Sequence, residues 1–235
     1  MKRIALIPLC LLGCGLPEPP ASGPPDVQPD ASASLPPEEQ LDPIPDAGPR
    51  VDAERGGGQV LTQTTSSLIE PDISIACNDD NGIHSENSYY RVFDLAAAGI
   101  TSTFHVTKVE VGVEIADGGD DGVQPVEVRL HSLTGELLIE NLTSLATVSQ
   151  VVPATVASRL TFDFDATVPA GAKLAVEVHT PDGQQGGDSF YIGANNDGQT
   201  APGYLRAPDC DDNQPTDLAQ IGFSDMHILI DVTGN

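Results

Sequence analysis

Three short stretches of this sequence decide its fold class: Val126-Glu-Val-Arg-Leu-His131, Leu160-Thr-Phe-Asp-Phe-Asp165 and Leu174-Ala-Val-Glu-Val-His179. In each stretch every second residue is apolar, and residues 226–232 repeat the alternation near the C-terminus. Because successive side chains of a β-strand point to opposite faces, this pattern is typical of strands with one apolar and one polar face. The sequence therefore predicts an all-β domain of antiparallel sheets packed through their apolar faces.

The longest alternating run, residues 104–115, contains one irregularity. Its phase slips between Val106 and Val109, which predicts a bulge near Thr107. Gly-containing turns separate the runs, and single helical turns are expected at 94–97 and 217–220. Further strands are expected at residues 73–77, 89–95, 136–140, 146–151 and 190–194. About nine short strands with this spacing predict an antiparallel β-sandwich or jelly roll.

The composition divides the chain into two parts. All ten aromatic residues lie from Tyr89 onward, whereas eleven of the twenty prolines lie between Pro17 and Pro49. A Pro-rich, acidic segment without aromatic residues cannot bury enough apolar surface to offset the entropy cost of folding. The sequence therefore predicts a signal peptide at residues 1–13, a disordered acidic linker at residues 14–67 and a folded β-sandwich at residues 68–235.

The N-terminus has the features of an export signal. A basic start, Met1-Lys-Arg3, precedes an apolar run at residues 4–12 that is too short to span a bilayer as a mature helix. The run ends at Leu11-Leu-Gly-Cys14, which resembles the lipobox of bacterial lipoproteins. The resemblance implies that Cys14 is lipidated and anchors an exported protein to the bacterial outer membrane or cell surface. An ordinary signal peptide cleaved elsewhere is the alternative.

The predicted folded part is strongly acidic. From Glu70 onward the sequence has 26 acidic and six basic residues, so its net charge is 6 − 26 = −20 with neutral histidines. This charge repels the phosphates of nucleic acids, which makes nucleic acid a poor partner. Cations and basic molecules are better partners, although solubility alone also explains an acidic surface.

Two further stretches point to a known type of module. Asn87-Ser-Tyr-Tyr-Arg-Val-Phe-Asp-Leu95 and Ile221-Gly-Phe-Ser-Asp-Met-His-Ile228 resemble a jelly-roll module of secreted bacterial surface proteins. That module occurs alone or appended to extracellular proteases and other multidomain proteins. The resemblance covers about residues 73–232 and implies an accessory or binding domain, not a catalyst.

The cysteines of the predicted domain suggest a disulfide and a metal site. An exported domain with one cysteine pair, Cys77 and Cys210, is expected to form a disulfide, with free thiols or a metal site as alternatives. Acidic residues follow both cysteines, and a disulfide brings them close together. Ca²⁺ takes six to eight oxygen ligands, so a structural calcium site is predicted. Two solvated loops that point apart are the alternative. The predicted ligands are Asp79, Asp80, Asp211 and Asp212.

The sequence contains no complete catalytic motif. Ser224, Asp225 and His227 are triad residue types without a nucleophile elbow, and Asp163 and Asp165 are expected on a solvated strand face. No zinc-binding spacing occurs among the histidines, which are all expected on exposed strand faces. They stand at positions 84, 105, 131, 179 and 227. A secreted hydrolase with an unrecognised carboxylate site remains the alternative function.

Binding is the function that the sequence favours. Tyr89, Tyr191 and Tyr204 can supply flat rings for a sugar or a peptide. Tyr89 and Tyr90 point to opposite faces of one strand, so at most one of them is expected in the core. The sequence thus predicts a non-catalytic, calcium-assisted lipoprotein with a binding or structural accessory domain. Its predicted partners are the membrane, through the lipid, and an envelope or extracellular protein or glycan.

Overall fold

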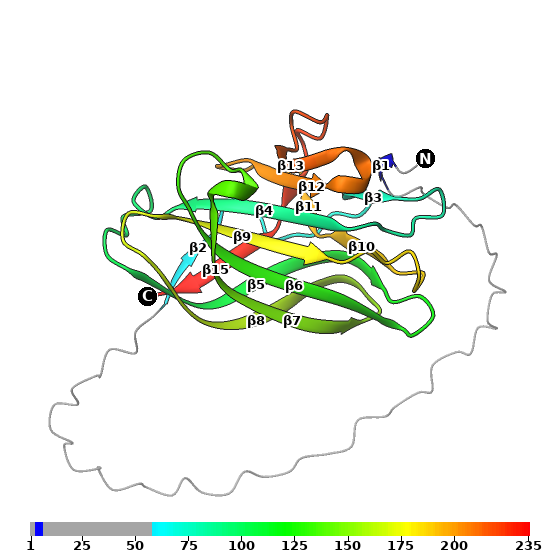
Figure 1. Cartoon of the computed structure of the whole chain (residues 1–235), viewed down its shortest axis with the longest axis horizontal. Helices are drawn as coiled ribbons and strands as arrows, with labels where there is room; N and C mark the ends of the chain where they lie inside the picture. Colours follow the sequence, from blue (N-terminus) through cyan, green and yellow to red (C-terminus); the bar gives the residue numbers. More distant parts are fainter. Residues whose placement is uncertain (1–2, 7–57) are drawn as a thin grey trace, which may run out of the picture. The chain divides into compact units, whose positions relative to one another are not determined.

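The computed structural model describes residues 3–6 and 58–235, and it confirms the predicted all-β sandwich (Figure 1). Its strands are antiparallel and lie in two main sheets and two short pairs. Helical structure in the described residues is limited to two 3₁₀ turns, η1 (Ile139–Asn141) and η2 (Pro208–Cys210). The predicted lipidation site, Cys14, lies outside the described residues.

The larger sheet has six strands in the order β13-β12-β4-β9-β6-β7. Strands β6 and β9 carry the alternating pattern, so their apolar side chains face the core and most of their polar side chains face outward. The strands are β4 (Asn87–Asp94), β6 (Val123–Leu133), β7 (Leu142–Pro153), β9 (Lys173–Thr180), β12 (Gly203–Ala207) and β13 (Asp212–Asp217).

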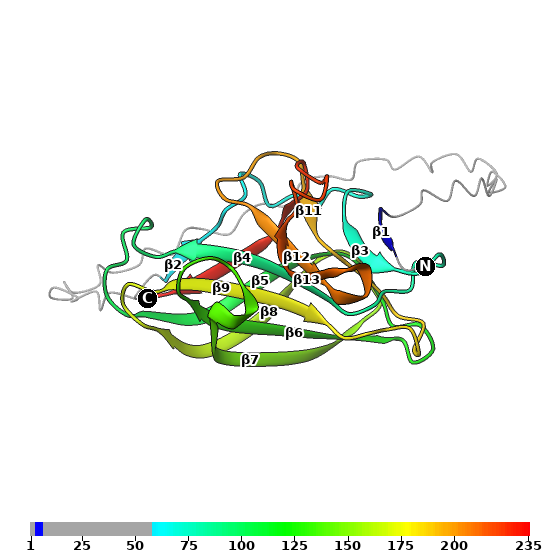
Figure 2. The same cartoon turned by 45° about the horizontal axis from the view of Figure 1, so that its top comes forward.

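The second sheet has five strands arranged around β5. One edge of β5 pairs with β8, and the other edge pairs with β15 and then with β10, while β2 pairs with the far side of β15. The chain crosses between the sheets from β4 to β5 and β6, and from β7 to β8 and β9, as in a jelly roll (Figure 2). The strands are β2 (Gln59–Leu61), β5 (Phe104–Asp117), β8 (Thr155–Val168), β10 (Ser189–Ile192) and β15 (Ile230–Gly234).

Two short pairs complete the described structure. β11 (Ala194–Asn195) pairs with β14 (His227–Ile228), and β1 (Arg3–Leu6) pairs with β3 (Ile75–Asn78). β1 lies within the predicted signal peptide, and its backbone pairs antiparallel with one edge of β3.

The core lies between the two sheets and follows the alternation. The inward residues of β6, Val126, Val128 and Leu130, are fully buried, as is Phe162 on β8. The predicted bulge in the longest strand is confirmed, because the register of β5 against β8 shifts between Val106 and Lys108.

The structure corrects several element predictions. Residues 136–140 form a loop with η1 instead of a strand, and Leu137 and Ile139 of this loop line pockets on the outer face of the six-stranded sheet. Residues 94–97 and 217–220 form turns that are capped by Asp94 and Asp217 but do not become helices. Strands β12 and β13 were not predicted. The folded part also begins before the predicted boundary at residue 68, since β2 pairs with β15 and buries Leu61.

The predicted disulfide is present between Cys77 and Cys210. It joins β3 to the 3₁₀ turn before β13 and closes a loop with a sequence separation of 133 residues. A cross-link over so long a loop removes many conformations from the unfolded chain. The disulfide therefore stabilises the sandwich mainly by restricting the unfolded state.

Removing the disulfide is expected to lower stability without changing the fold. In the Cys77→Ala/Cys210→Ala variant, the free energy of unfolding should fall by about 4–5 kcal/mol, the entropy of closing so long a loop. Urea unfolding of the variant and the parent protein, each with and without a reductant, measures this loss. The reductant should destabilise the parent and leave the variant unchanged. Equal stabilities of the oxidised parent and the variant would contradict the assignment.

Candidate functional site

The outer face of the six-stranded sheet carries an ordered set of polar side chains. Strand pairing places its outward-facing residues in rows that cross β12, β4, β9 and β6. One row consists of Arg206, Ser88, His179 and Glu127, and the next consists of Tyr204, Tyr90, Glu177 and Arg129. Alternation keeps these residues out of the core, and strand pairing aligns the hydrogen-bond donors and acceptors of four strands.

Glu177, on the central strand β9, connects this face. Its carboxylate accepts a hydrogen bond from Ser88 Oγ on β4 (2.8 Å) and another from Arg129 Nη1 on β6 (3.2 Å), and His131 Nε2 on β6 lies 2.9 Å from its second oxygen. The Glu177 side chain is only 6% exposed. Burial alone raises the pKa of Glu177, but the hydrogen bonds from His131 and Ser88 and the charge of Arg129 lower it to about 2.

Specific contacts orient the two histidines beside Glu177. Burial and the charge of Arg129 lower the pKa of His179. Ser88 donates its only proton to Glu177, so its oxygen accepts from Nδ1 of neutral His179, 3.1 Å away. His131 donates Nε2–H to Glu177, while its buried Nδ1 has no hydrogen-bond partner in the described residues.

A pocket of about 440 Å³ opens above this network, and we call it the charge-balanced pocket. Its lining includes one ion pair, Arg206 Nη1 with Glu86 Oε1 (2.7 Å), and Arg129 Nη2 pairs with Oε2 of Glu127 outside the lining (2.6 Å). The lining residues are Glu86, Tyr90, Arg129, His131, Ile139, Leu142, Ser144, Glu177 and Arg206.

The charge of this pocket differs from that of the rest of the domain. Among the lining residues, Arg129 and Arg206 balance Glu86 and Glu177, whereas the chain from Glu70 onward has 26 acids and six bases. One further base, Arg91, is buried and donates to the carbonyl of Ile228 (2.7 Å). Two of the few basic side chains are therefore placed together on one face of an acidic domain.

The three tyrosines predicted to bind a ligand have different surroundings. Tyr89 is fully buried and donates to the carbonyl of Ile75 (2.8 Å), and Tyr191 is 4% exposed with Asn78 Nδ2 donating to its hydroxyl (2.6 Å). Neither ring has a free face for a ligand. Tyr204 is half-buried and lies on the outer sheet face. Tyr89 lies in the core, whereas Tyr90 is buried on the outer face, so only one of the two is a core residue, as expected.

The expectation that all five histidines are exposed was wrong. His84, His131, His179 and His227 are each at most 9% exposed, and only His105 is more open. The outer sheet face is covered by long side chains and by the loop that follows β6, which alternation alone cannot show. Burial lowers the pKa of His84.

The aspartates near the disulfide show no metal geometry. Asp79 Oδ1 accepts from the backbone N–H groups of Asn81 and Ile83, and Asp212 accepts from the hydroxyl of Thr216. Within residues 3–6 and 58–235, no three His, Cys, Asp or Glu side chains gather where they could hold a metal ion. The calcium site at Asp79, Asp80, Asp211 and Asp212 stays a prediction.

The candidate catalytic residues are not assembled into a site. Ser224 donates to the adjacent Asp225, and His227 Nδ1 accepts from the backbone N–H of Gly198. Asp163 and Asp165 are exposed on β8, as predicted.

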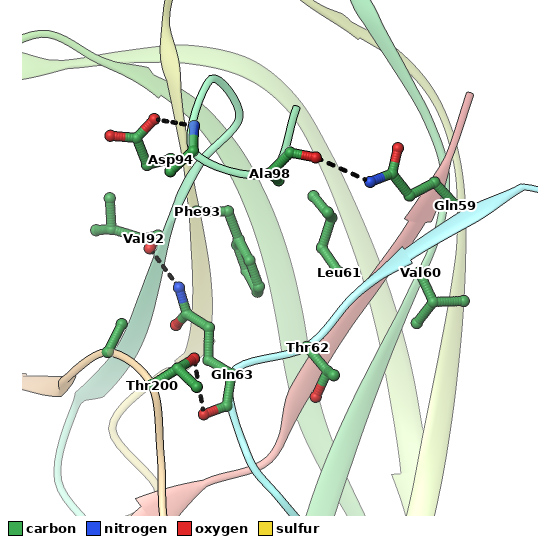
Figure 3. Close-up of a pocket in the computed structure, with 12 residues that line it drawn as sticks. Gln59, Val60, Leu61, Thr62, Gln63, Val92, Phe93, Asp94, Ala98 and Thr200 are labelled. Carbon is green, nitrogen blue, oxygen red and sulfur yellow. Dashed lines mark hydrogen bonds between the residues drawn. The ribbon is translucent and has the colours of Figure 1, made fainter. Parts of the chain in front are cut away.

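A second pocket, of about 470 Å³, lies between β2, the end of β4 and Thr200 (Figure 3). Its amide side chains bond to backbone carbonyls: Gln59 Nε2 to Ala98 O (3.3 Å) and Gln63 Nε2 to Val92 O (2.6 Å). These bonds join neighbouring segments of the fold. Gln63 Oε1 has no hydrogen-bond partner among the described residues.

No family model and no curated protein matches the chain. Among solved structures, the chain is similar to the cysteine protease and lectin-like domains of Cwp84, a surface layer associated protein of Clostridium difficile, with 15% identity, a TM-score of 0.48, and 69% of this chain and 37% of that chain covered. It is also similar to the clostridial cysteine protease Cwp84 after propeptide cleavage, with 14% identity, a TM-score of 0.46 and coverages of 70% and 43%. The chain spans less than half the length of either structure.

No helix among the described residues has the length and apolar character needed to cross a membrane.

The lowered pKa of Glu177, caused by its hydrogen bonds and by Arg129, predicts an acid-dependent loss of stability. Its pKa is about 2 in the folded protein, against an ordinary value of 4.5, and this difference corresponds to about 3 kcal/mol. Because the folded pKa is the lower one, this stabilisation is complete above pH 4.5 and is lost as the pH falls toward 2. Urea unfolding across this acidic range measures it.

The Glu177→Gln variant should lose that part of the pH dependence. The matched control, Asp163→Asn, removes an exposed carboxylate and should keep the slope of the parent protein. Parallel pH profiles for Glu177→Gln and the parent would rule out the proposed role of the carboxylate.

Proposed function

We propose that this chain is an exported lipoprotein, anchored through Cys14, whose β-sandwich is a non-catalytic module that binds a neutral glycan. The charge-balanced pocket on the outer face of the six-stranded sheet is the observation that carries the proposal. If the domain had a purely structural role, its outer face would only have to be soluble. Ion-paired, partly buried side chains around a pocket are instead typical of a surface that receives a ligand.

The arrangement of donors and acceptors favours hydroxyl groups as the recognised chemistry. A hydroxyl group both donates and accepts, so it can bond to a carboxylate such as Glu86 and to a guanidinium such as Arg206 at the same time. Both side chains are already oriented by their mutual ion pair. Ile139 and Leu142 add apolar contact area for the carbon-bound hydrogens of a sugar ring.

Charge argues against ionic ligands at this pocket. Each guanidinium already has a carboxylate partner, so an anion would have to compete with Glu86 or Glu177. The negative field of the whole domain also disfavours anions, including nucleic acids. A cation would meet Arg129 and Arg206. A neutral, polar molecule avoids both costs.

The lowered pKa of Glu177 does not suit the general acid of a hydrolase. A glycosidase acid carries a raised pKa so that it can donate a proton near neutral pH. The pKa of Glu177 shifts the other way, to about 2, and its carboxylate stays ionised. Glu114 has a pKa raised by burial, but its carboxylate accepts from the backbone N–H groups of Asp72 and Ser74. These contacts indicate a structural role for Glu114.

The glycan proposal predicts a selective effect at Arg206. Replacing Arg206 by Ala removes charge-assisted donors, which are worth about 1.5–3 kcal/mol, so affinity should fall by about tenfold or more. A glycan array followed by titration calorimetry measures this change on the purified protein. The control is Arg159→Ala, because Arg159 is 26% exposed against 25% for Arg206 and is paired with one carboxylate, Asp231, outside the pocket.

The parent protein and Arg159→Ala should bind the same glycan with equal affinity. Binding to no neutral glycan, or equal affinities of Arg206→Ala and the parent, would overturn the proposal. Capture of a protein ligand by the same face would point to a protein partner instead and would also overturn it.

The predicted calcium site is a separate part of the proposal. If Asp79, Asp80, Asp211 and Asp212 hold Ca²⁺, millimolar calcium should raise the melting temperature of the parent protein, and a chelator should reverse the rise. The Asp80→Asn/Asp212→Asn variant should not respond. A melting temperature that is the same with calcium and with chelator would exclude the site.

A further inference from the structure

A third pocket lies beside the charge-balanced pocket on the same sheet face. It has a volume of about 430 Å³, and we call it the tyrosine pocket because Tyr204 lines it. Tyr204 is the direct cross-strand partner of Tyr90, which lines the charge-balanced pocket. Such partners have Cβ atoms about 5 Å apart, so the two pockets adjoin across the β12–β4 pair.

The tyrosine pocket has the same kind of lining as its neighbour. One base, Lys173, and one acid, Glu136, again balance each other, and Gln220 adds an amide. The half-buried ring of Tyr204 and the side chain of Leu137 supply apolar surface. Three of the six bases of the folded part therefore line two neutral pockets on one face of an acidic domain.

One loop takes part in both pockets. Residues 134–141 connect β6 to β7, and we call them the strap. The strap lines the tyrosine pocket with Gly135, Glu136 and Leu137 before its tip, and it lines the charge-balanced pocket with Ile139 at its tip.

The strap is fastened to the other side of the sheet by one side chain. Gln214 on β13 accepts from the backbone N–H of Ile139 (2.9 Å) and donates to Glu140 (3.4 Å). Strands β9, β4 and β12 lie between β6 and β13 in the sheet, so the strap bridges the outer face (Figure 1). Ile139 remains 39% exposed, which leaves the tip in reach of a ligand.

We propose that the two pockets are compartments of one site for a linear glycan of several sugar units. This inference rests on the proposed function and specifies its ligand class. One part of the glycan lies in the charge-balanced pocket and another in the tyrosine pocket, and the chain passes over the strap between them. On β4, Tyr90 lines the first pocket and Val92 the second. Residues two apart on a strand are about 6.6 Å apart, so neighbouring sugar units can reach from one pocket to the other.

An extended site makes affinity depend on chain length. A single sugar fills one compartment, whereas a longer chain places its second part near the other compartment at high effective concentration. Tyr204 should then matter only for ligands long enough to reach it, while Arg206 should matter for every ligand.

The experiment titrates the purified protein with glucose and N-acetylglucosamine and with their β-1,4-linked oligomers. Affinity should rise at least tenfold from the single sugar to the longer oligomers. In Tyr204→Ala the affinity for the longer oligomers should fall by about tenfold, since an aromatic ring contributes on this scale. The affinity for the single sugars should not change. Tyr204→Phe, which keeps the ring, is the matched control and should bind like the parent.

The outcomes separate this inference from the proposed function. Glycan binding that depends on Arg206 but neither on chain length nor on Tyr204 would overturn the two-compartment site and leave the proposed function standing. Equal losses for short and long ligands in Tyr204→Ala would also overturn it. Absence of binding to these sugars and to every neutral glycan of the array would overturn both proposals.

Discussion

The outer face of this sandwich depends on one buried carboxylate. Glu177 stands on the central strand of the six-stranded sheet and takes hydrogen bonds from Ser88 on β4 and from Arg129 and His131 on β6. An ionised group with a 6% exposed side chain is stable only when its oxygens are paired. The three partners therefore have fixed positions, and they place a guanidinium, an imidazole and a hydroxyl side by side. The need to pair the oxygens of Glu177 therefore sets the geometry of the pocket above these residues.

Scarcity of positive charge makes the same face distinctive. A domain with six bases against 26 acids has few ways to form a neutral surface, and it does so around Glu177. Neutrality and fixed donors together suit a polar ligand without charge. The disulfide between Cys77 and Cys210 joins β3 to the 3₁₀ turn before β13. It supports the outer face indirectly, because β13 holds the strap through Gln214.

Much of the fold could be predicted from the sequence, and less of the site. Period-two alternation sets which residues of β6, β8 and β9 face the core, and a phase slip located the bulge in β5. β12 (Gly203–Ala207) escaped prediction because its alternation is short and places small residues on both sides of Leu205. β13 (Asp212–Asp217) escaped because its residues are almost all polar. The site escaped because alternation assigns Arg129, Glu177 and His179 to solvent. Their burial arises from neighbours on β4, β12 and the strap, which are distant in sequence. A faint signal existed, since Glu177 and His179 share one face of a strand with Ala175.

Mapping of backbone amide chemical shifts during titration with a bound glycan tests the central claim most directly. The account predicts that the largest changes fall on β4, β6, β9 and β12 around Ser88, Arg129, Glu177 and Arg206, and on the strap. Changes confined to the acidic loops after Cys77 and Cys210, or to the pocket beside β2, with the outer sheet face silent, would contradict it.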